Sequence, residues 1–114
     1  MPPAPLRLKR RAEFLRVAAA GRKAARPGLV LQARARGDDG PARLGFTVTK
    51  KVGNAIVRNR TRRRLKEAAR LLLRERAPQG VDLVLIGREA TRGRTFAALI
   101  EDLRQALSQV GAVP

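Results

Sequence analysis

The fold of this chain is decided by residues 50–66, which read KKVGNAIVRNRTRRRLK. This stretch contains eight basic residues and no acidic one, yet apolar residues recur through it at helical spacing. With about 100° of turn per residue, one face of a helix from Asn54 to about Arg76 collects Val57, Thr61, Leu65, Ala68 and Leu72. The pattern predicts a long helix that packs one face against a core, with Asn54 as its N-cap.

The opposite face of this helix is cationic and carries Asn59, Arg62, Arg63, Lys66 and Arg70, with Arg58 and Arg60 on its flanks. Solvated helices usually place Glu four residues from Lys or Arg, but the first acid here is Glu67. Guanidinium groups can grip phosphates through two bonds and stack on bases. We therefore expect this face to bind a polyanion. Arg64 lies beside the apolar stripe, so we expect its stem to pack while its charged head reaches solvent.

The composition limits the possible partners. The chain has 114 residues, 44% of them hydrophobic, and a net charge of +17, which favours nucleic acid first and an anionic membrane surface second. A membrane-binding helix would place mostly bulky apolar residues opposite its cations, whereas this helix places Val, Thr and Ala there beside Leu65 and Leu72. We expect residues 1–8 to be a flexible lead-in, residues 9–114 to form one domain, and the location to be cytoplasmic, with no signal peptide.

Further elements follow from the spacing of apolar residues. Helices are predicted over residues 10–20 and from a Thr95 cap to about 110, and strands over 22–26, 29–36, 43–49 and 81–87, the last as an inner strand. The strands at 29–36 and 43–49, separated by a Gly- and Asp-rich turn, predict an antiparallel hairpin. The order predicts an α+β sandwich with helices on a small sheet.

Residues able to carry out catalysis are scarce. The chain has one Ser and no His or Cys, so nucleophilic catalysis and zinc binding lack their usual groups. The nine acids are scattered. Asp38-Asp39 lies in a turn and Glu101-Asp102 is predicted on the outer side of the last helix. We therefore predict no catalytic residue, no metal site and no cofactor bound by the protein alone.

A motif of sixteen residues includes the start of the long helix and most of the strand before it. Residues 45–60 read GFTVTKKVGNAIVRNR and are followed by Arg62-Arg63 and Lys66-Glu67-Ala68. This closely resembles the signature of the bacterial ribonuclease P protein component, whose RNR motif matches residues 58–60. The resemblance extends to Phe14 and Val17 in the first helix and to residues 82–86 in the last strand.

The resemblance implies a fold and a function. The fold would be a single-domain α-β-β-β-α-β-α sandwich with a four-stranded sheet and a left-handed β-α-β crossover, against the usual rule. The protein would be a subunit of ribonuclease P, in which a catalytic RNA and its metal ions remove the 5′ leader from precursor tRNA. The implied partners are that RNA and the leader, with Mg²⁺ held mainly by RNA and with no membrane and no obligate protein partner.

Site residues are carried over from the family position by position. The set implied to bind the catalytic RNA is Lys50, Lys51, Asn54, Arg58, Asn59, Arg60, Arg62, Arg63 and Lys66. The set implied to form the leader cleft is Phe14, Val17, Gln32, Arg34, Arg43 and Thr47, with core packing an equal alternative for Phe14.

Two positions depart from the family pattern, because Ala18 and Gln32 stand where relatives often carry aromatics. A stacking platform contributes about 1–3 kcal/mol per base, so we expect leader binding here to rely more on charge and hydrogen bonds. Two other functions fit the size and charge: a non-catalytic RNA binder, such as a ribosomal protein or RNA chaperone, and a DNA-binding protein that places the long helix in a major groove.

Overall fold

The computed structural model describes residues 5–74 and 77–112, which form one α+β domain. The elements in chain order are β1 (Leu6–Arg7), α1 (Arg11–Ala19), β2 (Arg22–Arg26), β3 (Leu29–Ala35), β4 (Arg43–Thr47), α2 (Ala55–Leu73), β5 (Val81–Gly87), the 3₁₀ turn η1 (Glu89–Thr91) and α3 (Phe96–Gln109). The predicted single α+β domain with helices packed on a sheet is confirmed. Each predicted helix and strand is present within a few residues of its expected bounds, whereas β1 and η1 were not predicted.

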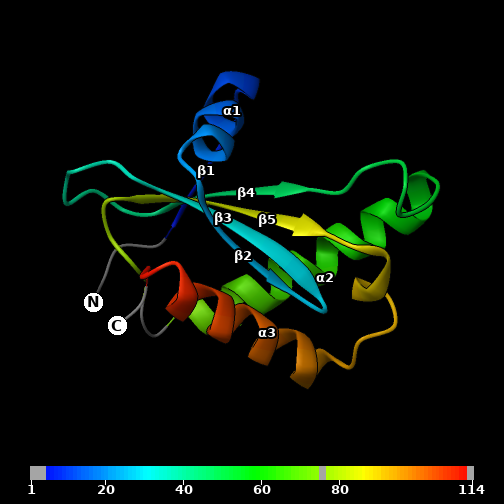
Figure 1. Cartoon of the computed structure of the whole chain (residues 1–114). Coiled ribbons are helices and arrows are strands. Elements are labelled where there is room, and N and C mark those ends of the chain that lie inside the picture. The colour runs from blue at the N-terminus through cyan, green and yellow to red at the C-terminus, as the bar shows by residue number, and fades with distance from the viewer. Residues whose placement is uncertain (1–4, 75–76, 113–114) are drawn as a thin grey trace.

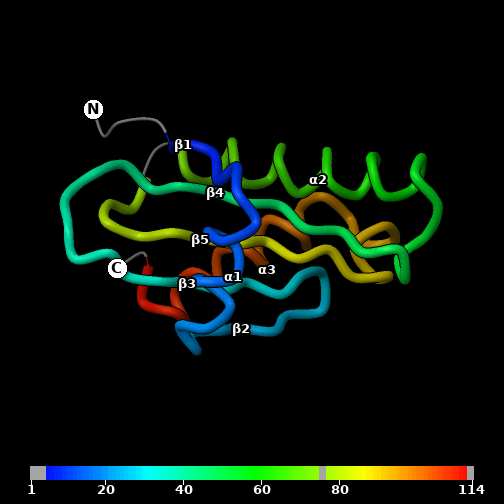
Figure 2. Tube along the Cα trace, turned by 90° about the horizontal axis from the view of Figure 1, so that it is seen from above, coloured from blue at the N-terminus to red at the C-terminus, as the bar shows by residue number. Residues whose placement is uncertain are grey.

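The sheet is mixed, with the strand order β1-β4-β5-β3-β2. β5 pairs parallel with β4 and antiparallel with β3, and β2 pairs antiparallel with β3. Helix α1 covers one face of the sheet, while α2 and α3 cover the other (Figure 1). Seen from above, the strands lie side by side with α1 nearest the viewer (Figure 2). The sheet has five strands in the described part of the chain, where four were expected, because β1 adds to the β4 edge.

The predicted hairpin of residues 29–36 and 43–49 is wrong. β3 and β4 run in opposite directions, but β5 lies between them and pairs with both. β5 is buried from Val81 to Leu85, and a strand that is apolar on both faces loses most contact with water at the centre of a sheet. Its prediction as an inner strand is confirmed.

The predicted lead-in also differs from the structure. Leu6 and Arg7 pair with Arg43 and Leu44 as β1, and Leu8 is buried. Residues 6–8 are therefore part of the domain, because their backbone completes the edge of β4. Residues 1–4 of the predicted lead-in lie outside the described residues.

Apolar side chains form a cluster on each side of the sheet. The larger one joins β3, β5, α2 and α3 through residues such as Leu31, Leu85, Leu65 and Leu103. It also buries Leu73, which is not among the residues predicted for the apolar face of α2. The smaller cluster, on the α1 side, consists of Leu8, Val17 and Val84 with Phe14 and Ile86 against it. The larger cluster anchors α2, so the direction of its outer face is set by the core.

Local chemistry defines the start of α2. The Asn54 side chain accepts a hydrogen bond from the Val57 backbone N–H at 3.0 Å, confirming the predicted N-cap. A Cβ at Gly53 would lie 2.7 Å from the Val57 side chain, which explains the glycine at the entry. The described helix ends at Leu73, and residues 75–76, within the predicted helix, lie outside the described residues.

Replacing Asn54 tests its capping role. Asn54→Ala is expected to lower the free energy of unfolding by about 1 kcal/mol, because the Val57 N–H loses its acceptor. Asn54→Asp keeps the acceptor and should keep the stability. Urea titrations of the three proteins test this, and equal stability of Asn54→Ala and the parent would contradict the capping role.

Candidate nucleic-acid interface

The outer face of α2 presents its cations to solvent. The exposed cations are Lys50 and Lys51, just before the helix, and Arg60 and Arg63 within it. Three further cations of the helix are partly covered: Arg58, Arg62 and Lys66. Asn59 is exposed and its side-chain oxygen accepts a hydrogen bond from Arg62 at 2.9 Å. Every residue predicted for this face therefore lies on the surface, on or just before one helix.

A cationic cluster extends this face toward the sheet edge. Burial, followed by the neighbouring charges of Arg7 and Arg62, lowers the pKa of Lys66. Arg7, from β1, also lies over the Phe46 ring with its guanidinium carbon 5.2 Å from the ring centre. Like charges held this close repel one another, and a bound polyanion would relieve that repulsion.

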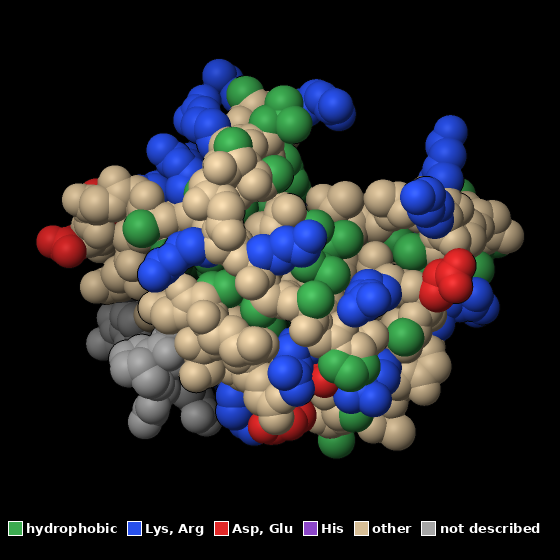
Figure 3. Space-filling model, in the orientation of Figure 1, with side chains coloured by type: hydrophobic (Ala, Val, Ile, Leu, Met, Phe, Trp, Pro, Cys, Tyr) green, Lys and Arg blue, Asp and Glu red, His purple; other side chains and the backbone are tan. Residues whose placement is uncertain are grey.

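A groove runs beside this cluster, between the start of α1, strand β4 and α2. It has a volume of about 480 Å³ and is lined by Lys9, Arg11, Phe14, Leu15, Phe46, Thr47, Val48 and Arg62. Leu15 is 55% exposed. The space-filling view shows basic and apolar side chains together around α1 (Figure 3). Aromatic rings flanked by cations suit an unpaired strand, whose bases can stack while its phosphates meet the charges.

The predicted cleft residues separate into three groups. Phe14 and Thr47 line the groove, and Phe14 also packs against the small cluster. Val17 is fully buried in that cluster and cannot touch a ligand in this conformation. Gln32 is partly covered on the α1 face of β3. Arg34 and Arg43 belong to a separate ionic network.

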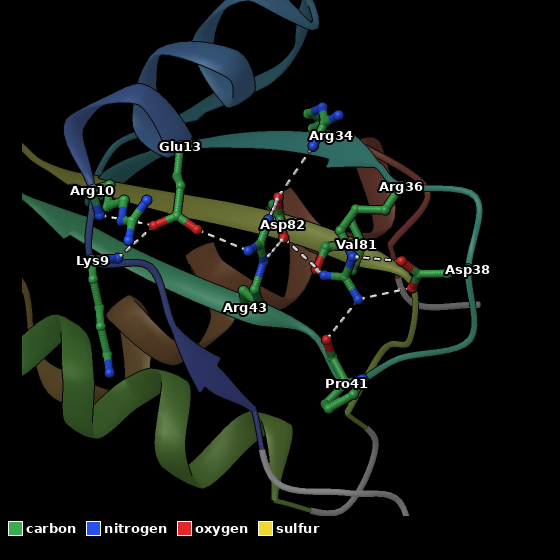
Figure 4. A network of polar contacts seen from close by, with 10 residues as sticks. All are labelled: Lys9, Arg10, Glu13, Arg34, Arg36, Asp38, Pro41, Arg43, Val81 and Asp82. Atoms are coloured by element: carbon green, nitrogen blue, oxygen red, sulfur yellow. Dashed lines mark hydrogen bonds and ion pairs between the residues drawn. The ribbon is translucent and has the colours of Figure 1, made fainter.

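That network is centred on Asp82, which is 1% exposed (Figure 4). Arg43 donates to both of its carboxylate oxygens at 2.8 and 2.7 Å, Arg36 donates at 2.8 Å, and Arg34 lies 3.5 Å away. Burial by itself would raise the pKa of Asp82, but the bonds from Arg43 and Arg36 outweigh it and hold the pKa below its ordinary value. The carboxylate is therefore charged at neutral pH.

The same network holds α1 in place. Arg43 also pairs with Glu13 of α1 at 2.8 Å. Glu13 in turn accepts from the backbone N–H groups of Lys9 and Arg10 at 3.0 and 2.8 Å, and these bonds lower its pKa. Arg43 thus joins the start of α1 to the sheet, and this fixes one wall of the groove. Sequence reasoning missed this role, although Asp82 stands out as an acid within an apolar run.

Two predictions about charged residues are wrong. The Arg64 head does not reach into solvent but donates to the backbone carbonyls of Thr91 and Arg94, both at 2.6 Å, and of Arg92 at 3.0 Å. Asp102 is buried rather than on the outer side of α3, and accepts from the Gly28 N–H and from Arg94, each at 3.0 Å. In both cases the partners lie outside the helix that carries the side chain, so helical spacing carried no sign of them.

Neither a metal cluster nor a membrane span is found among residues 5–74 and 77–112. No group of three or more His, Cys, Asp or Glu side chains there is placed to hold a metal ion. No helix in that part of the chain is long and apolar enough to cross a membrane.

Comparison with known proteins decides the family, because residues 2–111 match the model of the family described as Ribonuclease P. The chain belongs to the ribonuclease P protein family. It is 70% identical to the ribonuclease P protein component of Gluconacetobacter diazotrophicus over 92% of this chain and 90% of that one. It is 54% identical to that of Paramagnetospirillum magneticum, over 94% of this chain and 84% of that one.

Solved ribonuclease P proteins share the fold. The Staphylococcus aureus protein superposes with a TM-score of 0.79 at 25% identity, covering 97% of this chain and 100% of that one. The Thermotoga maritima protein gives a TM-score of 0.70 at 31% identity, covering 90% and 96%. Membership gives this chain the role of the ribonuclease P protein subunit in 5′ maturation of tRNA, and RNA is its partner.

Proposed function

We propose that this subunit binds the catalytic RNA of ribonuclease P through the outer face of α2 and the 5′ leader of precursor tRNA in the groove beside it. The observation that carries the proposal is the division of α2 into two faces. Thr61, Leu65 and Ala68 are buried, while Arg60 and Arg63 are exposed. A rigid helix with a packed back presents its cations in fixed positions, which suits a structured RNA with closely spaced phosphates.

The groove supports the leader assignment. Its size and its two rings, Phe14 and Phe46, fit an unpaired strand, and Lys9, Arg11 and Arg62 can meet phosphates. Phe46 was not among the predicted cleft residues, and here it supplies an aromatic platform although Ala18 and Gln32 do not. In this proposal Arg34, Arg43 and Val17 shape the cleft from behind, since their side chains are engaged or buried.

Chemistry at the scissile phosphate belongs, in this proposal, to the RNA and its Mg²⁺. The chain has no His or Cys and a single Ser, Ser108, which is exposed near the end of α3. The contribution of the protein is to position the RNA substrate and to neutralise its charge. Lys50, Lys51, Asn54, Arg58, Asn59 and Lys66 complete the set assigned to the catalytic RNA.

We propose also that the β4-α2-β5 crossover is left-handed, as the family resemblance implies. β4 and β5 are parallel neighbours joined through α2. In Figure 2 both strands run left to right with α2 returning behind the sheet, and the second strand lies below the first, an arrangement that supports this handedness.

A reconstitution tests the function. The protein is mixed with a bacterial ribonuclease P RNA and a precursor tRNA at low millimolar Mg²⁺, and release of the 5′ leader is followed. We expect the protein to stimulate cleavage by the RNA and to cleave nothing alone. Tight RNA binding without stimulation, with more than one such RNA, would instead favour a ribosomal or chaperone role.

Phe46→Leu tests the groove within the same assay. The substitution keeps an apolar side chain but removes the ring, so the holoenzyme is expected to lose about 1–3 kcal/mol of affinity for precursor tRNA. Affinity for mature tRNA, which lacks the leader, should not change. An equal loss for both substrates would show that Phe46 acts on the fold and not on the leader.

A further inference from the structure

We infer that a second pocket, between α2 and the loop after β5, binds one unpaired ribonucleotide of the RNA partner. This rests on the proposed function, because it adds a contact to the same RNA. The pocket has a volume of about 540 Å³ and is lined by Val57, Arg60, Thr61, Arg64, Glu89, Arg92 and Gly93. Three of these residues belong to the loop and lie outside the motif that marks the outer face of α2.

The loop wall of this pocket is built in advance of binding. Arg64 ties three loop carbonyls to α2. Thr91 is fully buried. Its hydroxyl donates to the Gly28 carbonyl at 2.6 Å and accepts from the Arg88 N–H at 2.8 Å. A ligand that enters therefore does not have to order the loop, which lowers the entropic cost of binding.

Two guanidinium groups of the pocket are available to an anion. Arg60 and Arg92 are exposed and come from opposite walls. Among the described residues, neither side chain takes part in a hydrogen bond or ion pair, whereas the Arg64 head is occupied by carbonyls. Two arginines facing one space suit a phosphodiester, since each can donate through two N–H groups.

The remaining lining fits a nucleotide better than a bare phosphate. The volume lies within the range of small-molecule sites and exceeds what one phosphate requires. Val57 supplies an apolar surface to the pocket. Glu89 adds a carboxylate to a lining whose other charged groups are arginines. That carboxylate would repel a lone phosphate but can accept a hydrogen bond from a ribose hydroxyl or a base amino group.

The test compares charge changes of opposite sign at the pocket. Arg92→Ala is expected to weaken binding to ribonuclease P RNA about tenfold, the loss of one charge-assisted contact. Glu89→Gln is expected to weaken it by about threefold or more, although it makes the protein more positive. Affinities are measured by filter binding at one fixed salt concentration, with circular dichroism melts to check that each variant folds.

Arg104→Ala is the matched control, because Arg104 is exposed on α3, away from the pocket, and its loss changes the net charge equally. The inference is overturned if Arg92→Ala weakens binding no more than Arg104→Ala, or if Glu89→Gln tightens it. Arg63→Ala separates the two proposals. If Arg63→Ala weakens binding while the pocket variants do not, the pocket does not bind RNA, and the proposed contact of the α2 face with RNA is supported. If it too has no effect, the α2 assignment fails as well.

Discussion

Replacing Asp82 with Asn is expected to lower the free energy of unfolding by about 3–5 kcal/mol, the usual cost of removing one partner from a buried ionic network. Asp82 is 1% exposed, and its carboxylate is approached by Arg43, Arg36 and Arg34. Asn preserves the shape but removes the charge shared by the three guanidinium groups, which leaves Arg43 with Glu13 and Arg36 with Asp38 as their remaining carboxylate partners. Domains of this size are stable by only about 5–15 kcal/mol, and the variant should therefore be marginal.

Urea denaturation measures this loss, and an unchanged m-value would show that the variant differs in stability and not in the surface exposed on unfolding. Glu101→Gln is the control, because it removes a carboxylate that pairs with Arg104 on the exposed side of α3, and surface pairs contribute little. If Asp82→Asn were no more destabilising than this control, the network would not hold the sheet and α1 together.

The dependence of stability on pH follows from the same network. The pKa of Asp82 is held below its ordinary value of 3.8, and the pKa values of Glu13 and Asp38 are also lowered. A carboxylate whose pKa is lower in the folded than in the unfolded protein stabilises the fold at pH values above its unfolded pKa. This stabilisation is lost as the pH falls through the pKa of the folded protein. Stability of the parent should fall below about pH 4, and Asp82→Asn should show a shallower fall.

Removing the side chains of Arg62, Arg63 and Lys66 together is expected to weaken binding to ribonuclease P RNA by about 100- to 1,000-fold. These residues lie on the outer face of α2, opposite buried Leu65 and Ala68. Alanine is the best helix former, and the triple variant also relieves repulsion within the cationic cluster. The fold should therefore survive, and the loss should appear in binding alone.

Affinity measured over a range of salt concentrations tests this expectation. Each phosphate contact releases counterions, so the association constant falls as salt is added. A plot of the logarithm of this constant against the logarithm of the salt concentration should be less steep in the variant, by about 2–3 units of slope. A control triple variant with Arg22, Lys23 and Arg104 changed to Ala removes the same charge from β2 and α3. Equal losses in the two variants would mean that net charge, and not the α2 face, determines binding.

Much of the local structure was predictable because short-range physics determines it. The spacing of Val57, Thr61 and Leu65 defined both faces of α2, and Asn54 marked its start, since a capping bond spans only three residues. The apolar run in β5 marked an inner strand. The motif around residues 58–60 pointed to the family and to a set of candidate RNA-binding residues, all of which lie at least partly exposed on the surface.

The amino-acid sequence by itself determined all three α-helices and every strand except β1, the cationic face of α2 and the membership of the ribonuclease P protein family. The tertiary structure alone decided which segments meet. It placed β5 between β3 and β4, gathered three arginines around Asp82, and turned the Arg64 head onto the η1 loop. The physical reason is that spacing along the chain reports which face a side chain occupies, whereas its partner depends on contacts between residues far apart in sequence.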